Sequence, residues 1–136
     1  MYILDTHTLL WLFDEDENLS SSAKNVILTE DTLYVSIVTF WEIAIKQNIE
    51  KLKLEYTPSE LITLAEQQAI SVLQISPKHL DTIRTLEKIH NDPFDRLIIA
   101  QAQCERYDDY YKRFYYSKIQ SKNLMVILGG NYGFKF

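Results

Sequence analysis

Short β-prone runs alternate with longer helical patterns along most of the chain. The apolar runs at residues 2–4, 33–36 and 71–75 have the length of strands, and the segments between them are too long for hairpins. Parallel strands need such long crossovers, which are usually helical, and the helices then cover both faces of the sheet. The alternation therefore predicts an α/β fold with a central, mainly parallel β-sheet flanked by helices on both faces.

Caps and periodicity indicate where the helices lie. Aspartate is a good N-cap and proline suits the first helical position, so Asp92-Pro93 is expected to begin a long apolar helix. Residues 51–58 read as an extended segment or loop. The expected helices span 8–13, 20–28, 39–49, 59–69, 77–88 and 94–105, and a further strand is expected at 124–128, followed by a turn at 129–131.

The size and composition indicate one domain without covalent cross-links. A chain of 136 residues with 46% apolar content can bury one ordinary core, so residues 1–136 are expected to form a single domain. The single cysteine, Cys104, excludes an internal disulfide and suggests a reducing compartment. No apolar run approaches the ~20 residues that cross a bilayer, and the start lacks the basic region of a signal peptide, so we expect a cytoplasmic protein.

Three acidic residues occupy positions that a parallel α/β sheet would bring together. Asp5 follows the first strand, Glu42 lies in the helix after the second, and Asp95 lies at the start of the long helix. Converging carboxylates repel one another unless they share a cation, and Mg²⁺ or Mn²⁺ prefers oxygen ligands. Because the net charge of −5 argues against a basic nucleic-acid-binding surface, such a metal centre would also be the means of holding a phosphodiester.

Each of these acids also has an ordinary structural explanation. Asp5 can end a strand and cap the next helix. Glu42 and Lys46 have the i, i+4 spacing of a surface ion pair, and Asp92 with Asp95 resembles a capping box. Only the combination of the three acids favours a functional site.

Other polar residues near the expected site are explained more simply by local structure. Thr6, His7 and Ser36 can orient carboxylates, but polar residues at strand-to-helix turns usually cap the helix. His7 has no second histidine or cysteine at metal-ligand spacing, which argues against zinc. Cys104 lies on an apolar helix face and is expected in the core.

Three segments together resemble the signature of VapC-like toxins, which are PIN-domain proteins of toxin–antitoxin pairs. The order and spacing match over about residues 1 to 105. The segments are Ile3-Leu4-Asp5-Thr6-His7, Ser36 with Trp41-Glu42-Ile43-Ala44-Ile45-Lys46, and Asp92-Pro93-Phe94-Asp95-Arg96-Leu97-Ile98-Ile99-Ala100-Gln101-Ala102.

The resemblance implies a Mg²⁺-dependent endoribonuclease that cleaves RNA, commonly tRNA or ribosomal RNA. It also implies a homodimer that is held inactive by a cognate antitoxin, which usually inserts a basic side chain near the acidic cluster. Carried over by position, the metal-binding and catalytic acids are Asp5, Glu42 and Asp95. The supporting residues are Thr6, Ser36, Lys46 and Arg96, of which Lys46 and Arg96 would steady the site or the phosphate.

The C-terminal segment 106–136 departs from the family pattern. Family members continue into a strand with a fourth acid, whereas Asp108 and Asp109 are the only acids here and neither follows an apolar strand. One hypothesis is a frameshift: residues 106–124, back-translated with A/T-rich codons and read one nucleotide later, can encode the missing strand, aspartate and closing strand. Codons that cannot encode them would exclude this.

A frameshifted end leaves a second function open. Loss of an acid weakens metal affinity, and loss of two strands could expose a sheet edge. The alternative to an active nuclease is then a catalytically impaired PIN domain that only binds an antitoxin or dimerises. A more distant alternative is a flavodoxin-like domain for Mg²⁺-dependent phosphoryl transfer, which lacks the expected lysine after a late strand.

Overall fold

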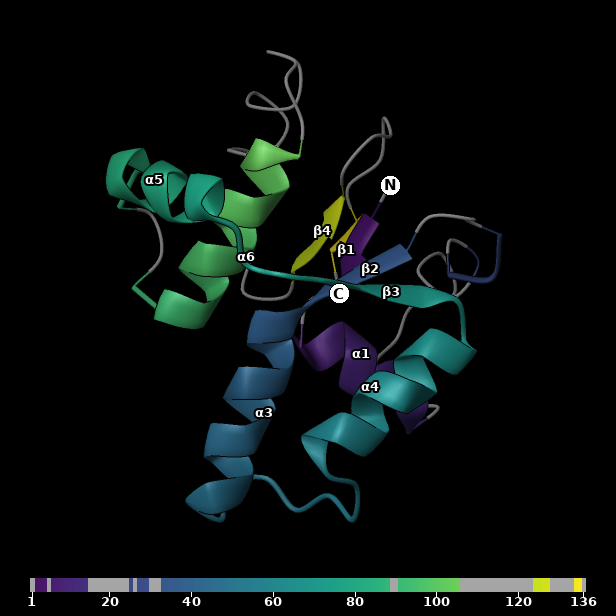
Figure 1. Ribbon diagram of the computed structural model, residues 1–136. Coiled ribbons are helices and arrows are strands. Elements are labelled where there is room, and N and C mark those ends of the chain that lie inside the picture. Colours follow the sequence, from purple (N-terminus) through teal and green to yellow (C-terminus); the bar gives the residue numbers. More distant parts are fainter. Residues whose placement is uncertain are drawn as a thin grey trace.

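The computed structural model describes residues 2–4, 6–14, 25, 27–29, 33–88, 91–105, 124–127 and 134–135. The helices and strands follow one another along the chain in the predicted alternating pattern (Figure 1). In chain order they are β1 (Tyr2–Leu4), α1 (Thr6–Phe13), β2 (Leu33–Ser36), α3 (Ile37–Asn48), α4 (Pro58–Gln67), β3 (Ile70–Leu73), α5 (Pro77–Thr85), α6 (Pro93–Cys104), β4 (Leu124–Ile127) and β5 (Phe134–Lys135).

The described strands form one sheet in the order β3-β2-β1-β4-β5. Strands β1, β2 and β3 are parallel to one another, whereas β4 is antiparallel to β1 and to β5. The predicted parallel core of the α/β fold is confirmed, because each parallel neighbour is reached through helical segments.

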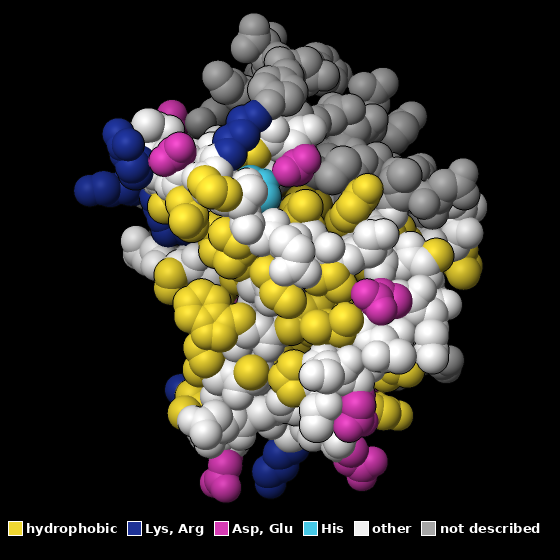
Figure 2. Space-filling model, in the orientation of Figure 1, with side chains coloured by type: hydrophobic (Ala, Val, Ile, Leu, Met, Phe, Trp, Pro, Cys, Tyr) yellow, Lys and Arg dark blue, Asp and Glu magenta, His cyan; other side chains and the backbone are white. Residues whose placement is uncertain are grey.

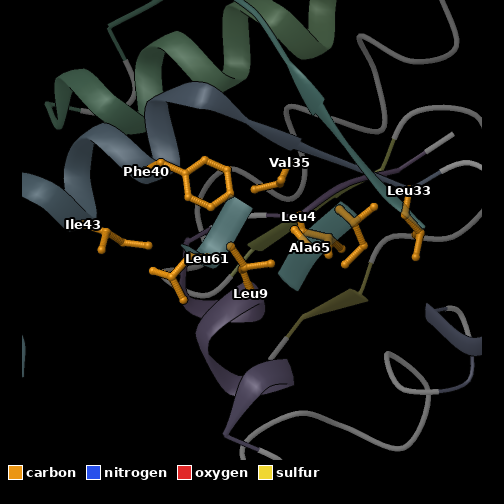
Figure 3. Packing of buried hydrophobic residues seen from close by; sticks show 9 residues of the cluster. Leu4, Leu9, Leu33, Val35, Phe40, Ile43, Leu61 and Ala65 are labelled. Carbon is orange, nitrogen blue, oxygen red and sulfur yellow. The ribbon is translucent and has the colours of Figure 1, made fainter. Parts of the chain in front are cut away.

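The strands bury alternate residues on opposite faces, as the period of two requires. Leu33 pairs with Ile70 and Val35 with Val72, and these side chains join a core cluster with α1, α3 and α4. Figure 3 shows eight of its side chains converging from β1, α1, β2, α3 and α4: Leu4, Leu9, Leu33, Val35, Phe40, Ile43, Leu61 and Ala65. This cluster fills one face of the sheet.

A second cluster fills the other face, beneath α5 and α6. It contains Ile3, the neighbour of Leu4 on β1, together with Val38 and the apolar side of α6. Figure 1 shows α5 and α6 on one side of the sheet and α1 and α4 on the other. The prediction of helices on both faces is therefore confirmed.

Buried polar contacts attach α5 to α6. His79 is buried, its Nδ1 accepts the Ser76 N–H at 3.0 Å, and its Nε2 lies 3.0 Å from the Glu105 carboxylate. Because Nδ1 accepts, Nε2 must carry the proton and donate to Glu105. Cys104 is buried as predicted, 2.8 Å from the Thr82 hydroxyl.

Several helices begin earlier than predicted, and in α3 and α4 a capping residue sets the first turn. The helix expected from residue 8 begins at Thr6, and the one expected from residue 39 begins at Ile37, where the Ser36 hydroxyl accepts the Val38 N–H at 3.1 Å. Thr57 caps α4, so that helix begins at Pro58. The helix expected to reach residue 88 ends at Thr85, since Leu86 has an extended backbone.

The C-terminal strands complete the sheet. The predicted strand at 124–128 is confirmed as β4, which pairs with β1, whereas β5 was not predicted. The described C-terminal residues thus add two strands to the sheet beside β1. The turn predicted at 129–131 lies outside them, and of the helix predicted at 20–28, Asn25 and residues 27 and 28 are described and are helical. Among the described helices, none is both long and apolar enough to cross a membrane.

Candidate metal centre

Three carboxylates converge where α3 meets the start of α6. Glu42 lies in α3, Asp92 is the N-cap of α6, and Asp95 lies in the first turn of α6. One oxygen from each lies within 4.8 Å of the others. The two helices pack against one another, and α3 follows β2 directly, so the cluster belongs to the carboxyl-end side of the parallel strands (Figure 1).

Glu42 is the buried member of the cluster. It is 4% exposed, and its Oε2 lies 3.0 Å from Lys46 Nζ. The Thr6 hydroxyl lies 3.5 Å from Glu42 Oε1 and 3.3 Å from the Thr39 hydroxyl. A buried carboxylate needs such partners, because burial without them would be costly. The partners therefore hold the Glu42 side chain in a fixed position.

Asp92 and Asp95 are exposed and lie at the positive end of the α6 dipole. Asp92 Oδ1 accepts the N–H groups of Phe94 at 2.8 Å and Asp95 at 3.2 Å. The predicted capping role of Asp92 is confirmed, and the same side chain also belongs to the acidic cluster. The place of Asp92 in the acidic cluster was not predicted from the sequence, although its spacing from Asp95 places both acids in one helical turn.

The structure brings together only some of the residues predicted for the site. Glu42 and Asp95 lie together, with Lys46 and Thr6 bonded to Glu42. Asp5 lies outside the described residues. Its prediction as a metal ligand is therefore untested.

Ser36 and Arg96 each link two structural elements through hydrogen bonds. The Ser36 hydroxyl donates to the Gln101 side-chain oxygen, and Gln101 Nε2 donates to the Gln74 carbonyl at 3.3 Å. The Arg96 guanidinium donates to the carbonyls of Leu86 at 3.3 Å and Glu87 at 3.1 Å. Ser36 thus links the start of α3 to α6, and Arg96 ties the start of α6 to the segment after α5.

Two polar residues, Gln101 and His7, have surroundings that the sequence does not reveal. Gln101 is fully buried on the apolar face of α6, and no sequence signal distinguishes it from an exposed glutamine. His7, considered as an orienting residue, is exposed and lies beside Trp11, with ring centroids 5.9 Å apart.

The residues of the cluster fit a hard divalent cation. Three carboxylates supply oxygen atoms of the kind that such a cation prefers, and the Lys46 ammonium pairs with one of them, Glu42. Glu42 is buried and fixed by Thr6 and Lys46, while Asp92 and Asp95 face solvent, where an ion and a phosphodiester can enter. The arrangement can hold Mg²⁺ or Mn²⁺ and leave room for substrate oxygens.

These features define an α/β domain with a cluster of three carboxylates beside a parallel sheet. Residues 2–108 match the family model of the PIN domain, and the chain belongs to that family. PIN domains are generally Mg²⁺-dependent nucleases, which agrees with the acidic cluster. No curated protein matches the chain in sequence.

Proposed function

We propose that the chain is a Mg²⁺- or Mn²⁺-dependent endoribonuclease and the toxin of a toxin–antitoxin pair. The nuclease proposal rests on one observation: carboxylate oxygens of Glu42, Asp92 and Asp95 lie within 4.8 Å of one another in a PIN domain. The toxin role rests on the similarity of the three sequence segments to VapC-like proteins, which also favours a cytoplasmic homodimer that binds an antitoxin.

In this proposal Glu42, Asp92 and Asp95 hold the metal, and Asp5 joins them. Asp5 stands in the chain between Leu4, which ends β1, and Thr6, whose hydroxyl reaches Glu42 at 3.5 Å. Consecutive Cα atoms are about 3.8 Å apart, so this connection supports its inclusion. A bound divalent ion supplies Lewis-acid chemistry, activation of water and neutralisation of charge on the phosphodiester.

The surrounding residues prepare this centre. Lys46 and Thr6 fix the orientation of Glu42, and the N–H groups of α6 fix that of Asp92. Arg96 keeps the start of α6 in place through the carbonyls of Leu86 and Glu87. These residues hold the acids in position before the substrate arrives, which avoids reorganisation during the reaction.

The test is cleavage of total cellular RNA by the purified chain with Mg²⁺ or Mn²⁺ and with EDTA. Asp95→Asn and Glu42→Gln should abolish metal-dependent cleavage, which also excludes a contaminating nuclease. The control is Glu66→Gln, which removes an exposed acid of α4 outside the cluster. A folded wild-type protein that does not cut RNA would contradict the nuclease and favour the antitoxin-binding module.

The toxin role has a separate test. Expression of the chain should arrest growth, and Asp95→Asn should restore it. Growth arrest that persists in this variant would contradict toxicity through RNA cleavage.

A further inference from the structure

An exposed aromatic pair stands beside the acidic cluster. Trp41 immediately precedes Glu42 in α3, and Phe94 lies between Asp92 and Asp95 at the start of α6. The two rings meet edge to face, with centroids 5.0 Å apart and planes at 74°. The pair therefore spans the same helix junction as the acids.

The two rings differ in exposure: Trp41 faces solvent, whereas Phe94 packs against the core. Trp41 is 55% exposed, whereas Phe94 is half-buried and packs against the second core cluster. Hydrophobic side chains gather in the middle of the face shown in Figure 2. A large aromatic side chain gains free energy by burial, so its exposure in a fixed orientation beside a centre for phosphate chemistry suggests a ligand.

We propose that Trp41, held by Phe94, stacks on an unpaired nucleobase of the RNA whose phosphodiester lies at the acidic cluster. This rests on the proposed ribonuclease function and adds to it the form of the substrate. RNA carries a planar base and a phosphate on each nucleotide, which matches an aromatic ring next to metal-binding acids. A base in a duplex has both faces covered, so the platform selects single-stranded segments.

The nucleobase explains the position of Trp41 better than a protein partner does. Ile45 and Ile49 continue the exposed stripe along α3, one and two turns further on, and a protein partner would cover all three. Of the three, Trp41 is the one whose ring contacts Phe94 of α6, and Phe94 lies in the chain between two members of the acidic cluster, Asp92 and Asp95. A chain that binds nucleic acid with a net charge of −5 also needs contacts that do not depend on a basic surface.

The experiment measures binding of a single-stranded RNA oligonucleotide in Ca²⁺. Trp41→Leu should weaken binding about 5- to 100-fold, because stacking on one base contributes about that much, and Trp41→Phe should retain most of the affinity. An abasic oligonucleotide and the same strand annealed to its complement should bind equally to wild type and Trp41→Leu. Tyr56→Leu, at an exposed aromatic residue beyond the far end of α3, is the matched control and should leave affinity unchanged.

A second measurement leaves Trp41 intact. The chain has two tryptophans, so Trp11→Phe makes Trp41 the only one, and the single-stranded oligonucleotide should quench its fluorescence while the abasic one should not. Equal affinity of wild type and Trp41→Leu, equal loss with the abasic strand, or absence of quenching would overturn the platform. A change of oligomeric state caused alike by Trp41→Leu and Ile49→Ala would show instead that α3 binds protein.

Cleavage assays separate this inference from the proposed function. If wild type cuts RNA with metal and Glu42→Gln does not, but Trp41→Leu binds and cuts like wild type, the platform is wrong and the nuclease stands. If binding depends on Trp41 but nothing is cut, the platform stands and the nuclease is wrong. If no RNA binds, both are wrong.

Discussion

Replacing Glu42 by glutamine should stabilise the metal-free protein. Glu42 lies within 4.8 Å of Asp92 and Asp95, and even at the dielectric constant of water each such pair repels by about 1 kcal/mol. The contact with Lys46 at 3.0 Å offsets part of this, about 0.3–0.5 kcal/mol for a helical pair with one exposed partner. Glutamine keeps the shape and the Thr6 contact, so the free energy of unfolding should rise by roughly 1 kcal/mol, or about 3–5 °C in Tm.

A divalent cation should reverse this order. An ion present at 100 times its Kd stabilises the folded wild type by about 2.7 kcal/mol, because it binds only the assembled cluster. Glu42→Gln loses one charged ligand and should gain less than about 1 kcal/mol at the same concentration. The variant should therefore be the more stable protein in EDTA and the less stable one with Mn²⁺ or Mg²⁺.

Thermal unfolding of both proteins in EDTA and across a metal titration measures this crossover. Glu66→Gln is the control, since it lies outside the cluster and should follow wild type under both conditions. Lower stability of Glu42→Gln in EDTA would refute the repulsion argument. An equal response of the two proteins to metal would refute the role of Glu42 as a ligand.

Substitutions at three positions probe the cluster and the groups around it. Lys46→Met removes a positive charge that is partly solvent-screened and should raise Mn²⁺ affinity about 2- to 10-fold by calorimetry; unchanged or weaker affinity would contradict competition between lysine and metal. Ser36→Ala removes the cap of α3 and the partner of Gln101, so chemical denaturation should show a loss of about 1–3 kcal/mol, and a loss below 0.5 kcal/mol would contradict this. Asp92→Asn keeps a good cap, so it should lose metal affinity but keep its stability. Asp92→Ala should lose metal affinity and also about 1 kcal/mol of the free energy of unfolding; equal stability of the two variants would contradict the capping role.

Much of the fold could be predicted because its local signals agree. The run 33–36 is a strand in both the prediction and the structure, and Asp92-Pro93 begins α6 as expected. The segment that gives β5 could not be predicted, since a two-residue strand has no periodicity and depends on pairing with β4. The early start of α3 was also missed, because the Ser36 hydroxyl decides it and the apolar pattern does not.

The sequence predicted an acidic site for a divalent cation, but not all of the residues that form it. Sequence order places Glu42 and Asp95 after elements that meet in a parallel sheet. It does not show that Asp92, one turn before Asp95, also lies close to Glu42 on the other helix. The burial of Glu42 was likewise hidden, because its spacing from Lys46 has the form of an exposed ion pair. Burial and convergence are properties of the packing of α3 against α6, and only the structure contains them.

The double role of Asp92 explains why the capping and metal-binding interpretations do not compete. A helix N-terminus presents N–H groups without intrahelical partners and a partial positive charge, so an aspartate there caps the helix and also offers a carboxylate at the helix end. Its Oδ1 accepts the two N–H groups, and a carboxylate has further lone pairs available to a cation. The capping bonds therefore fix Asp92 at the end of the helix, and α6 can present two acids to α3 without unwinding its first turn.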